Sequence, residues 1–587
     1  MTRLCALLLA AAAVLPAAPA VAADVGMDAG ARAAIPPELS EAERSAYREI
    51  FAAIRAEDWL GAATKIAATP EGLLHNAARA ELYLAKGSPR VELDQILPLV
   101  QRAPEMPKAD QLARLAATRG ATELPQLPEA QKLIWVGSQP RRGRAEATKN
   151  DPVAQGLEPQ IQPLIVDDRP GDAEMLLRQN EAVLGADART EYLQRIAWSY
   201  YLIGADRDAL RLAEEARLGT SEWAVQGAWV AGLANWRMND CKAAADAFAT
   251  VAGRTSDIEL AAAGNYWAAR ADMVCARPER VQPRLRSAAR HKETFYGMLS
   301  ATALGIKAPN FAGLHNYRDA EWQGIGRKPN VRAAIALAEI GENELADQFI
   351  RHQARIGGAA DHNALLHLAA DLNLASTQFY LAHNAPRGAN VNVAARYPRP
   401  DWRPVRGWRV DQSLALAHAL QESNFRTSAV SSAGAVGLMQ VRPGTAGDFA
   451  RKRGEPFAAQ QLTNPSTNME YGQSYLESLR DNSATGGLLP KVIAAYNAGP
   501  VPVAEWNLRR FDKGDPLLYI ESIPYWETRG YVPIVLRNYW IYEHESGKSS
   551  NSRKALAQGL WPKFPGMPGA TAVRADPGAA RLNYGTE

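Results

Sequence analysis

The chain has 587 residues, of which 47% are hydrophobic and 22% are charged, and its formal net charge is +3. This length predicts two to four domains, and the hydrophobic content excludes general disorder. The small net charge argues against a nucleic-acid partner, because such partners favour a concentrated basic face. No stretch beyond the N-terminal region approaches the length that a membrane span requires.

The N-terminus has the features of an export signal. Arg3 supplies a positive charge, Leu4 to Leu15 form an apolar stretch, and Ala20-Val21-Ala22 is a small-residue cleavage site. A membrane anchor is the alternative, but the stretch is short and is interrupted at Pro16 and Pro19. We therefore expect residues 1–22 to be a cleaved signal peptide and the mature protein to be periplasmic.

From Ser40 to Leu304 the sequence is rich in Ala and Leu and has helical periodicity. The stretch from Tyr200 to Ala209 resembles that from Asn235 to Ala244, an offset of 35 residues. A period of this size predicts stacked helix pairs, each of which buries its apolar face against a neighbour. Because the repeats are irregular, we predict a curved α-superhelix whose aromatic residues are core.

Two cysteines, Cys241 and Cys275, remain after the signal. An exported compartment permits a disulfide between them. Their separation of 34 residues approximates one helical repeat, and equivalent sites on stacked repeats are often too far apart for the Cα separation of about 5.5 Å that a disulfide needs. The pairing is left open at this point.

The rest of the chain divides by composition. Ser138 to Asp168 reads as a loop or an extended crossing segment, and its basic run at 140–144 reads as a solvated face rather than a substrate contact. Polar, Gly- and Pro-rich sequence follows Glu543 and predicts a flexible tail. We predict an all-α protein with a signal peptide (1–22), a superhelical domain (23–329), a helical linker domain (330–394), a catalytic module (395–545) and a tail (546–587).

Glu422 is the most informative residue of the catalytic module. It follows the apolar helical stretch from Ser413 to Leu420, and it is the only acid between Asp411 and Asp448. A lone carboxyl against an apolar helix loses hydration when charged, so its pKa should rise. A raised pKa suits a general acid that holds its proton at neutral pH. The alternative is a solvated glutamate at a helix end with no chemical role.

Three further motifs follow Glu422-Ser423 in order: Gly437-Leu438-Met439-Gln440, Ala495-Tyr496-Asn497-Ala498-Gly499 and Glu527-Thr528-Arg529-Gly530-Tyr531-Val532. Together the four motifs resemble those of the soluble lytic murein transglycosylases, and the resemblance covers roughly residues 395–545. It implies a lysozyme-like module that cleaves the glycan strands of peptidoglycan.

The resemblance also implies a mechanism with one carboxylate. Glycosidases usually need two, but the acetamido oxygen of an N-acetylated sugar can replace the second. Glu422 would protonate the glycosidic oxygen of the MurNAc-GlcNAc β-1,4 bond and then deprotonate the C6 hydroxyl of the muramic residue. The product would be a 1,6-anhydro sugar, formed without water, and one residue would serve as acid and base in turn.

The same resemblance implies that the substrate groove is lined by Ser431, Met439, Gln440, Tyr496, Glu527 and Tyr531. Core packing is the alternative for Met439 and Tyr496. For Glu527 and Arg529 the alternative is an internal ion pair. We expect no metal and no cofactor, because the sequence has neither a ligand cluster nor a phosphate-binding glycine loop.

Two rival functions remain open. One is a peptidoglycan hydrolase on the same lysozyme-like fold, which a well-placed second acid would favour. The other is a non-catalytic glycan-binding scaffold, against which the intact Glu422 argues. We expect a monomer that binds glycan strands, and the resemblance leaves open whether cell-wall synthesis proteins bind the superhelix.

Overall fold

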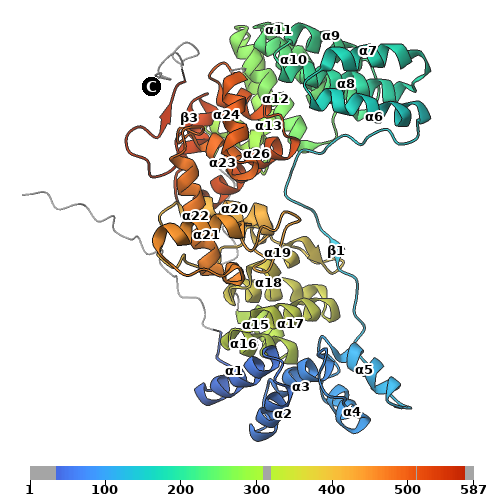
Figure 1. Ribbon diagram of the computed structural model, residues 1–587, viewed down its shortest axis with the longest axis vertical. Helices are drawn as coiled ribbons and strands as arrows, with labels where there is room; N and C mark the ends of the chain where they lie inside the picture. Colours follow the sequence, from blue (N-terminus) through green and yellow to red (C-terminus); the bar gives the residue numbers. More distant parts are fainter. Residues whose placement is uncertain (1–34, 308–318, 510–511, 576–587) are drawn as a thin grey trace, which may run out of the picture. The chain divides into compact units, whose positions relative to one another are not determined.

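The computed structural model describes residues 35–307, 319–509 and 512–575, whose regular secondary structure is almost entirely helical (Figure 1). The predicted all-α class is confirmed. The predicted signal peptide, residues 1–22, lies outside the described residues. No helix in the described part combines the length and apolar character of a membrane span. The strands are two residues each: β1 (Ile134–Trp135) pairs with β2 (Asn384–Ala385), and β3 (Trp561–Pro562) pairs with β4 (Ala572–Val573), both antiparallel.

One group of helices combines the start of the chain with a segment some 300 residues later. Its members are α1 (Glu41–Arg55), α2 (Trp59–Ala68), α3 (His75–Leu84), α4 (Leu93–Arg102), α5 (Ala109–Thr118), α15 (Asp319–Ile325), α16 (Pro329–Glu339), α17 (Asn343–Ile356), η2 (Ala359–Asp361), α18 (His362–Asp371), α19 (Ala375–His383) and η3 (Val393–Arg396).

The local sequence determines where α1 begins, and contacts with the distant helix α16 hold α1 in place. Ser40 and Glu43 form a capping box, which satisfies backbone donors at the helix start. The carboxylate of Glu339 on α16 accepts hydrogen bonds from the backbone of Glu38 and from the Arg44 side chain, at 2.7 and 2.9 Å. Helices α1–α5 and α15–α19 also share one hydrophobic cluster.

The predicted boundary between residues 23–329 and 330–394 is therefore not a boundary in the packing. The first five helices bury their apolar faces with the predicted linker domain, whereas residues 154–299 share a second hydrophobic cluster with the catalytic module. Composition could not predict this division, because both clusters join segments that are distant in sequence.

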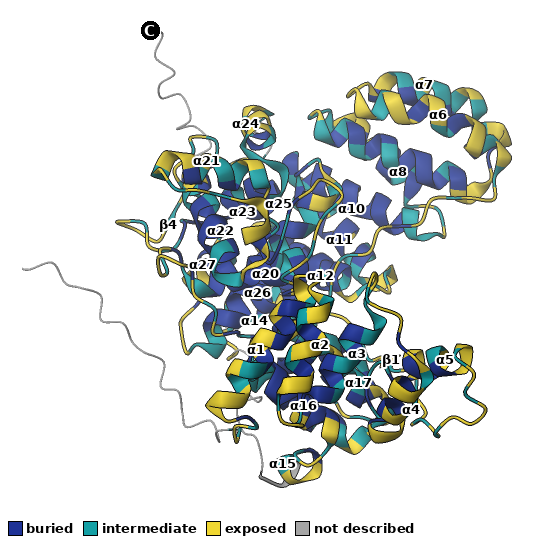
Figure 2. Ribbon diagram, turned by 60° about the horizontal axis from the view of Figure 1, so that its bottom comes forward, coloured by how far each residue is buried: buried dark blue, intermediate teal, exposed yellow. Residues whose placement is uncertain are grey.

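The predicted repeat region consists of consecutive helical hairpins. Its helices are α6 (Pro152–Val166), α7 (Pro170–Asn180), η1 (Glu181–Val183), α8 (Ala186–Leu202), α9 (Asp206–Ala216), α10 (Glu222–Arg237), α11 (Cys241–Arg254), α12 (Ile258–Val274), α13 (Pro278–Ala289) and α14 (Phe295–Ala303). Helices α10 and α12 are buried over most of their length and appear dark blue in Figure 2.

The repeat offset of 35 residues corresponds to equivalent turns between helices. Gly204 and Asn239 both have positive φ, at 84° and 66°, and each lies between two helices of a hairpin. Gly adopts this conformation without strain and Asn tolerates it better than most residues. The predicted helical-repeat architecture is confirmed, and the aromatic residues Trp229 and Trp267 are core, as predicted.

Cys241 and Cys275 form a disulfide with a Cα separation of 5.6 Å. The sequence left this pairing open, and the structure forms it. Cys241 begins α11 and Cys275 follows the last residue of α12. Because consecutive helices run antiparallel, the start of one lies beside the end of the next.

The segment from 121 to 151 crosses between the two groups without a helix, apart from the short strand β1. The prediction of an extended crossing segment is thus right up to Asp151. It is wrong for residues 152–166, which form α6 with Pro152 at its first turn. The solvated-face interpretation of the basic run is also wrong for Arg142, whose side chain is 14% exposed and pairs with Glu521.

The catalytic module contains α20 (Gln412–Ser423), α21 (Pro443–Arg453), η4 (Ala459–Thr463), α22 (Pro465–Arg480), α23 (Leu489–Ala498), α24 (Pro500–Arg509), α25 (Pro516–Glu521) and α26 (Trp526–Glu545). Its core helix α20 packs against α26, which brings the motifs at 422 and 527–532 together.

The predicted flexible tail is wrong for residues 551–575. Helix α27 (Asn551–Ala557) and the β3–β4 hairpin follow α26, and Trp561 and Phe564 are 1% and 2% exposed. The indole Nε1 of Trp561 donates to the carbonyl of Gly514 at 2.8 Å. A few large apolar side chains therefore anchor a segment whose average composition is polar.

Candidate active site

Glu422 lies in the last turn of α20, a helix that is otherwise mostly buried. The helix begins at Asp411, whose carboxylate caps the Ser413 N–H, and it ends at Asn424, which has a left-handed conformation with φ 51°. The Ser423 hydroxyl donates to the carbonyl of Leu438 at 2.8 Å. Glu422 itself is partly exposed, so the fold brings its carboxyl to the surface at the end of an apolar element.

The surroundings of Glu422 raise its pKa to about 7. Loss of hydration on burial is the main cause, as the sequence predicted, and the negative charge of Glu527 adds to it. The hydroxyl of Tyr531 donates to Oε1 of Glu422 at 2.5 Å, and this hydrogen bond acts in the opposite direction. A carboxyl with this pKa can both donate and accept a proton near neutral pH.

The loop at 437–440 packs directly behind the end of α20. Gly437 has φ 78°, and a Cβ there would lie 2.4 Å from the carbonyl oxygen of Leu462, so only glycine fits. The Met439 N–H donates to Asn468 Oδ1 at 2.8 Å. Gln440 has φ 47°, and its amide donates to the carbonyl of Gly437 at 2.9 Å.

Met439 contributes its backbone, rather than its side chain, to the site. Its side chain is fully buried and lies against Gly472, where an added Cβ would meet the sulfur at 2.3 Å. The hydroxyl of Tyr496 on α23 donates to the Met439 carbonyl at 2.7 Å. The core-packing alternative thus describes the Met439 side chain. It also describes the ring of Tyr496, which is 9% exposed and belongs to the hydrophobic core, while its hydroxyl links two motifs.

The four motifs meet around Glu422. Asn497 donates to Glu527 Oε1 at 3.2 Å and accepts from the Thr528 hydroxyl at 2.6 Å. These two hydrogen bonds connect the motif at 495–499 with the motif at 527–532. Glu527 is exposed, and the sequence alternative of an ion pair with Arg529 is not formed. Instead, Arg529 donates to the carbonyl of Ile523 at 2.8 Å.

Ser431 is held within its own turn. Its hydroxyl accepts from the Ala435 N–H at 3.0 Å, and the residue is partly exposed. The structure thus groups Glu422 with Tyr531, Tyr496 and Glu527. Gln440 and the Met439 backbone support this group from behind, and Ser431 lies in the loop that leads into them.

The sequence reasoning missed His418, which lies one helical turn before Glu422 on α20. Its ring lies 4.6 Å from that of Tyr496 and 6.2 Å from that of Tyr531, measured between centroids. Nδ1 bonds the Leu414 carbonyl, and burial lowers the pKa of His418 to about 4, so the ring is neutral. The four-residue spacing from Glu422 was the signal that could have identified it.

Among residues 35–307, 319–509 and 512–575 no group of three or more His, Cys, Asp or Glu side chains is placed to hold a metal ion. The expectation that the reaction needs no metal or cofactor stays a prediction.

The helical fold and the site around Glu422 together indicate a lytic transglycosylase. Residues 405–518 match the family model of the transglycosylase SLT domain, and the predicted resemblance to soluble lytic murein transglycosylases is confirmed. The soluble lytic murein transglycosylase of Salmonella typhimurium is 38% identical over 148 residues, which are 25% of this chain and 23% of the relative. That of Escherichia coli K12 is 36% identical over 159 residues, 27% of this chain and 24% of the relative.

The sequence match thus spans about a quarter of these curated relatives. The likeness in structure extends further. The 70-kDa soluble lytic transglycosylase Slt70 of Escherichia coli superposes with a TM-score of 0.55 over 89% of this chain and 99% of that chain, at 18% identity. At this identity the comparison establishes the fold, an α-superhelix combined with a lysozyme-like module.

Proposed function

We propose that the chain is a periplasmic lytic transglycosylase that cleaves the MurNAc-GlcNAc β-1,4 bond of peptidoglycan and leaves a 1,6-anhydro-muramyl end. The observation that carries the proposal is the carboxyl of Glu422, which is desolvated, reachable from solvent and bonded to Tyr531 within an SLT domain.

The geometry supports an order of proton transfers. Because Tyr531 donates to Oε1 of Glu422, the transferable proton belongs on Oε2. Oε2 protonates the glycosidic oxygen as the bond to C1 breaks, and the hydrogen bond from Tyr531 stabilises the carboxylate that results. The acetamido oxygen of the muramic residue stabilises the cationic centre. The carboxylate then takes the proton of the C6 hydroxyl as that oxygen bonds to C1.

The groove residues follow from the same proposal. Tyr496 and Tyr531 face the reacting sugar, Glu527 and Gln440 supply polar contacts, and the Met439 backbone and Ser431 shape the adjacent wall. Peptidoglycan glycan strands are the partner, and the active form is a monomer.

A hydrolase is the second candidate, because Glu527 lies close enough for its charge to act on Glu422. A second carboxylate could activate a water molecule. The exposed position of Glu527 and its bond to Asn497 favour a polar contact with the substrate over a role as a second catalytic acid.

Product analysis separates the two candidates. Purified glycan strands would be digested with the full chain and the fragments weighed by mass spectrometry. The transglycosylase yields 1,6-anhydro ends that are lighter by one water than the reducing ends of a hydrolase. Reducing ends as the main product would refute the proposal, and absence of cleavage would favour a glycan-binding scaffold.

A further inference from the structure

A row of four aromatic rings leads to Glu422 and joins four helices of the catalytic module. Tyr475 on α22 lies 5.2 Å from Tyr496 on α23, measured between ring centroids. Tyr496 lies 4.6 Å from His418 on α20, and His418 lies 6.2 Å from Tyr531 on α26. All three separations fall within the range of about 4.5–7 Å that packed aromatic pairs adopt. His418 thus links the rest of the row to Tyr531, the ring that bonds Glu422.

A hydrogen bond to its own helix fixes the ring of His418. A carbonyl oxygen can only accept, so Nδ1 carries the proton and donates to the Leu414 carbonyl at 2.9 Å. The other nitrogen, Nε2, therefore bears a lone pair, and it has no hydrogen-bond partner within the part of the chain that the structure describes. The side chain is fully buried, and burial lowers its pKa to about 4, so the ring is uncharged where Glu422 titrates. Turning the ring would break the bond at Nδ1.

Local stability does not explain a histidine at this position. A buried acceptor without a donor costs free energy, which an apolar side chain of similar size would avoid. His362, the first residue of α18, shows that such a nitrogen alone does not identify a functional residue. It is 1% exposed, its Nε2 donates to the Leu381 carbonyl at 2.9 Å, and its Nδ1 has no partner among the described residues. His418 differs from it because it lies against two tyrosines of the candidate active site.

The two tyrosines that contact His418 each donate a hydroxyl to an oxygen of the site. Tyr496 donates to the Met439 carbonyl at 2.7 Å, and Tyr531 donates to Oε1 of Glu422 at 2.5 Å. Nε2 of His418 accepts from neither hydroxyl, so the ring acts on the tyrosines through packing. His418 and Glu422 are four residues apart on α20, so one helix carries both the carboxyl and the ring that meets Tyr531. The place of this ring therefore affects where the Tyr531 hydroxyl lies relative to Glu422.

We infer that His418 is a positioning residue of the proposed transglycosylase. Its fixed ring holds Tyr531 in place, so that the hydroxyl donates to Oε1 of Glu422 and Oε2 is left to protonate the glycosidic oxygen. The ring does not touch the sugar itself, because it is fully buried. The inference rests on the proposed function and adds to it the residue that orients the hydrogen bond to the acid.

Apart from His418 and Tyr531, the ionisable groups around the site are Glu527 on α26, Tyr496 on α23, Tyr475 on α22 and Arg426 in the loop after α20. Burial raises the pKa of both of these tyrosines, so neither is charged near neutral pH. The arginine is exposed and donates to a backbone carbonyl at 3.2 Å. The charge that acts on Glu422 is that of Glu527, and a change at His418 leaves it in place. The pH profile of such a variant thus reports the hydrogen bond from Tyr531.

The test measures the pH at which kcat/KM on glycan falls, for the unmodified full chain and for His418→Leu. Leucine is apolar and of similar size, so it keeps water out but removes the fixed ring. Because the hydrogen bond from Tyr531 lowers the pKa of Glu422, its loss should move the fall to higher pH by about one pH unit. His418→Met, whose flexible side chain adapts to the space, should give the same shift, and it replaces the leucine variant where that variant does not fold.

Two further variants separate positioning from a general loss of packing. In Tyr531→Phe there is no hydroxyl to position, so adding His418→Leu should produce no further shift. His362→Leu is the matched control, because it removes a buried histidine with the same kind of bond; it should lower the Tm and leave the fall where it is. The inference is overturned if the folded His418 variants leave the fall unmoved, or if the shift of His418→Leu adds to that of Tyr531→Phe.

A titration without substrate separates this inference from the proposed function. NMR on the isotope-labelled chain follows the carboxyl carbon of Glu422, whose signal is identified by its absence from Glu422→Gln. A higher pKa of Glu422 in His418→Leu, but not in His362→Leu, supports the positioning of Tyr531 even where no glycan is cleaved. Absence of cleavage by the unmodified chain contradicts the proposed function, whereas an unchanged pKa of Glu422 in His418→Leu contradicts the inference.

Discussion

Glu422 in the catalytic module and Glu259 in the superhelical region are both glutamates whose carboxyls lose hydration in the fold, and this loss raises the pKa of each to about 7. Their contacts differ. Glu422 is partly exposed and receives the hydroxyl of Tyr531. Glu259 is 7% exposed, and its Oε1 accepts the backbone N–H of Phe295 at the start of α14.

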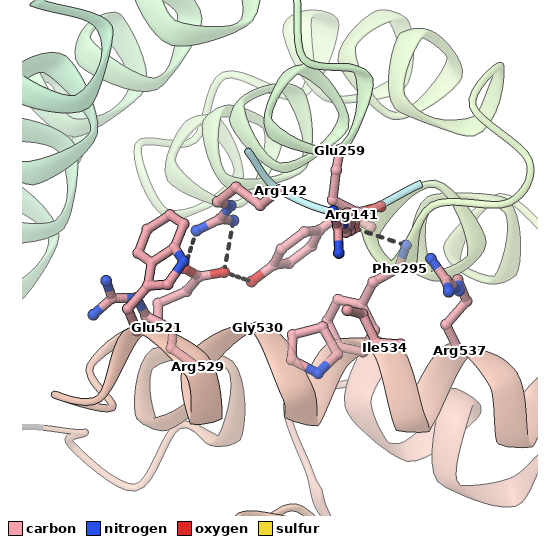
Figure 3. A pocket seen from close by; sticks show the side chains of 12 residues that line it. Arg141, Arg142, Glu259, Phe295, Glu521, Arg529, Gly530, Ile534 and Arg537 are labelled. Carbon is pink, nitrogen blue, oxygen red and sulfur yellow. Dashed lines mark hydrogen bonds and ion pairs between the residues drawn. The ribbon is translucent and has the colours of Figure 1, made fainter. Parts of the chain in front are cut away.

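The comparison shows that a raised pKa does not by itself identify a catalytic acid. Desolvation raises the pKa of both carboxyls to the same range. Only Glu422 combines this raised pKa with access for a substrate and with a hydrogen bond from the Tyr531 hydroxyl. Glu259 instead satisfies a free N–H group in the first turn of α14, and this hydrogen bond favours the carboxylate but does not outweigh the loss of hydration. Figure 3 shows it in the wall of a pocket between the superhelical region and α26.

The largest effect is expected for Glu422→Gln. The amide keeps the shape of the side chain but cannot transfer a proton, so turnover on glycan should fall by about 10²–10⁴-fold. The release of fragments from purified glycan measures this, with circular dichroism to confirm folding. Turnover within tenfold of the unmodified chain would show that Glu422 is not the acid.

A large loss of stability is expected for Arg142→Met, which breaks the ion pair between the two regions. The guanidinium binds Glu521 through two hydrogen bonds, of 2.7 and 3.1 Å, and Tyr296 donates to the same carboxylate at 2.6 Å. Glu521 is 1% exposed, so the variant leaves a buried charge without its cation, at a cost of about 3–5 kcal/mol.

Chemical denaturation measures this loss, with Arg141→Met as the matched control because the side chain of Arg141 is exposed and forms no ion pair with the described residues. Equal stability of the two variants would mean that the pair contributes nothing.

A smaller effect is expected for Glu259→Gln, and it should appear in stability rather than activity. The folded-state pKa of about 7 lies above the ordinary glutamate value of 4.5, so ionisation of Glu259 destabilises the fold as the pH rises from 4.5 to about 7. The amide still accepts from Phe295 but does not ionise. The variant should therefore lose less of its Tm over this interval, while its turnover stays within a few-fold of the unmodified chain.

Melting curves between pH 4.5 and 7, together with the glycan assay, check both halves of this expectation. A tenfold loss of turnover in folded Glu259→Gln would remove the distinction between the two glutamates.

The sequence predicted the features that depend on neighbouring residues. Glu422 was identified because it is a lone acid at the end of an apolar helix, and the hairpins were identified because Gly204 and Asn239 recur at one repeat. The features that it missed depend on distant segments. The burial of the Met439 side chain depends on Gly472, and the burial of Arg142 depends on its ion pair with Glu521. The order of residues 551–575 depends on the burial of Trp561 and on its hydrogen bond to the distant carbonyl of Gly514.

The pH dependence of kcat/KM tests the central claim most directly, since it reports the proton on Glu422 in the free enzyme. We predict a fall as the pH rises through about 7. Tyr531→Phe removes the hydrogen bond that lowers the pKa of Glu422, so the fall should move to higher pH. Glu527→Gln removes the charge that raises this pKa, so the fall should move to lower pH.

Glu259→Gln should leave the position of the fall unchanged, and circular dichroism at each pH excludes unfolding as its cause. Shifts in opposite directions for Tyr531→Phe and Glu527→Gln would establish Glu422 as the titrating acid. A profile that is flat across pH 7, or that neither variant moves, would contradict the account.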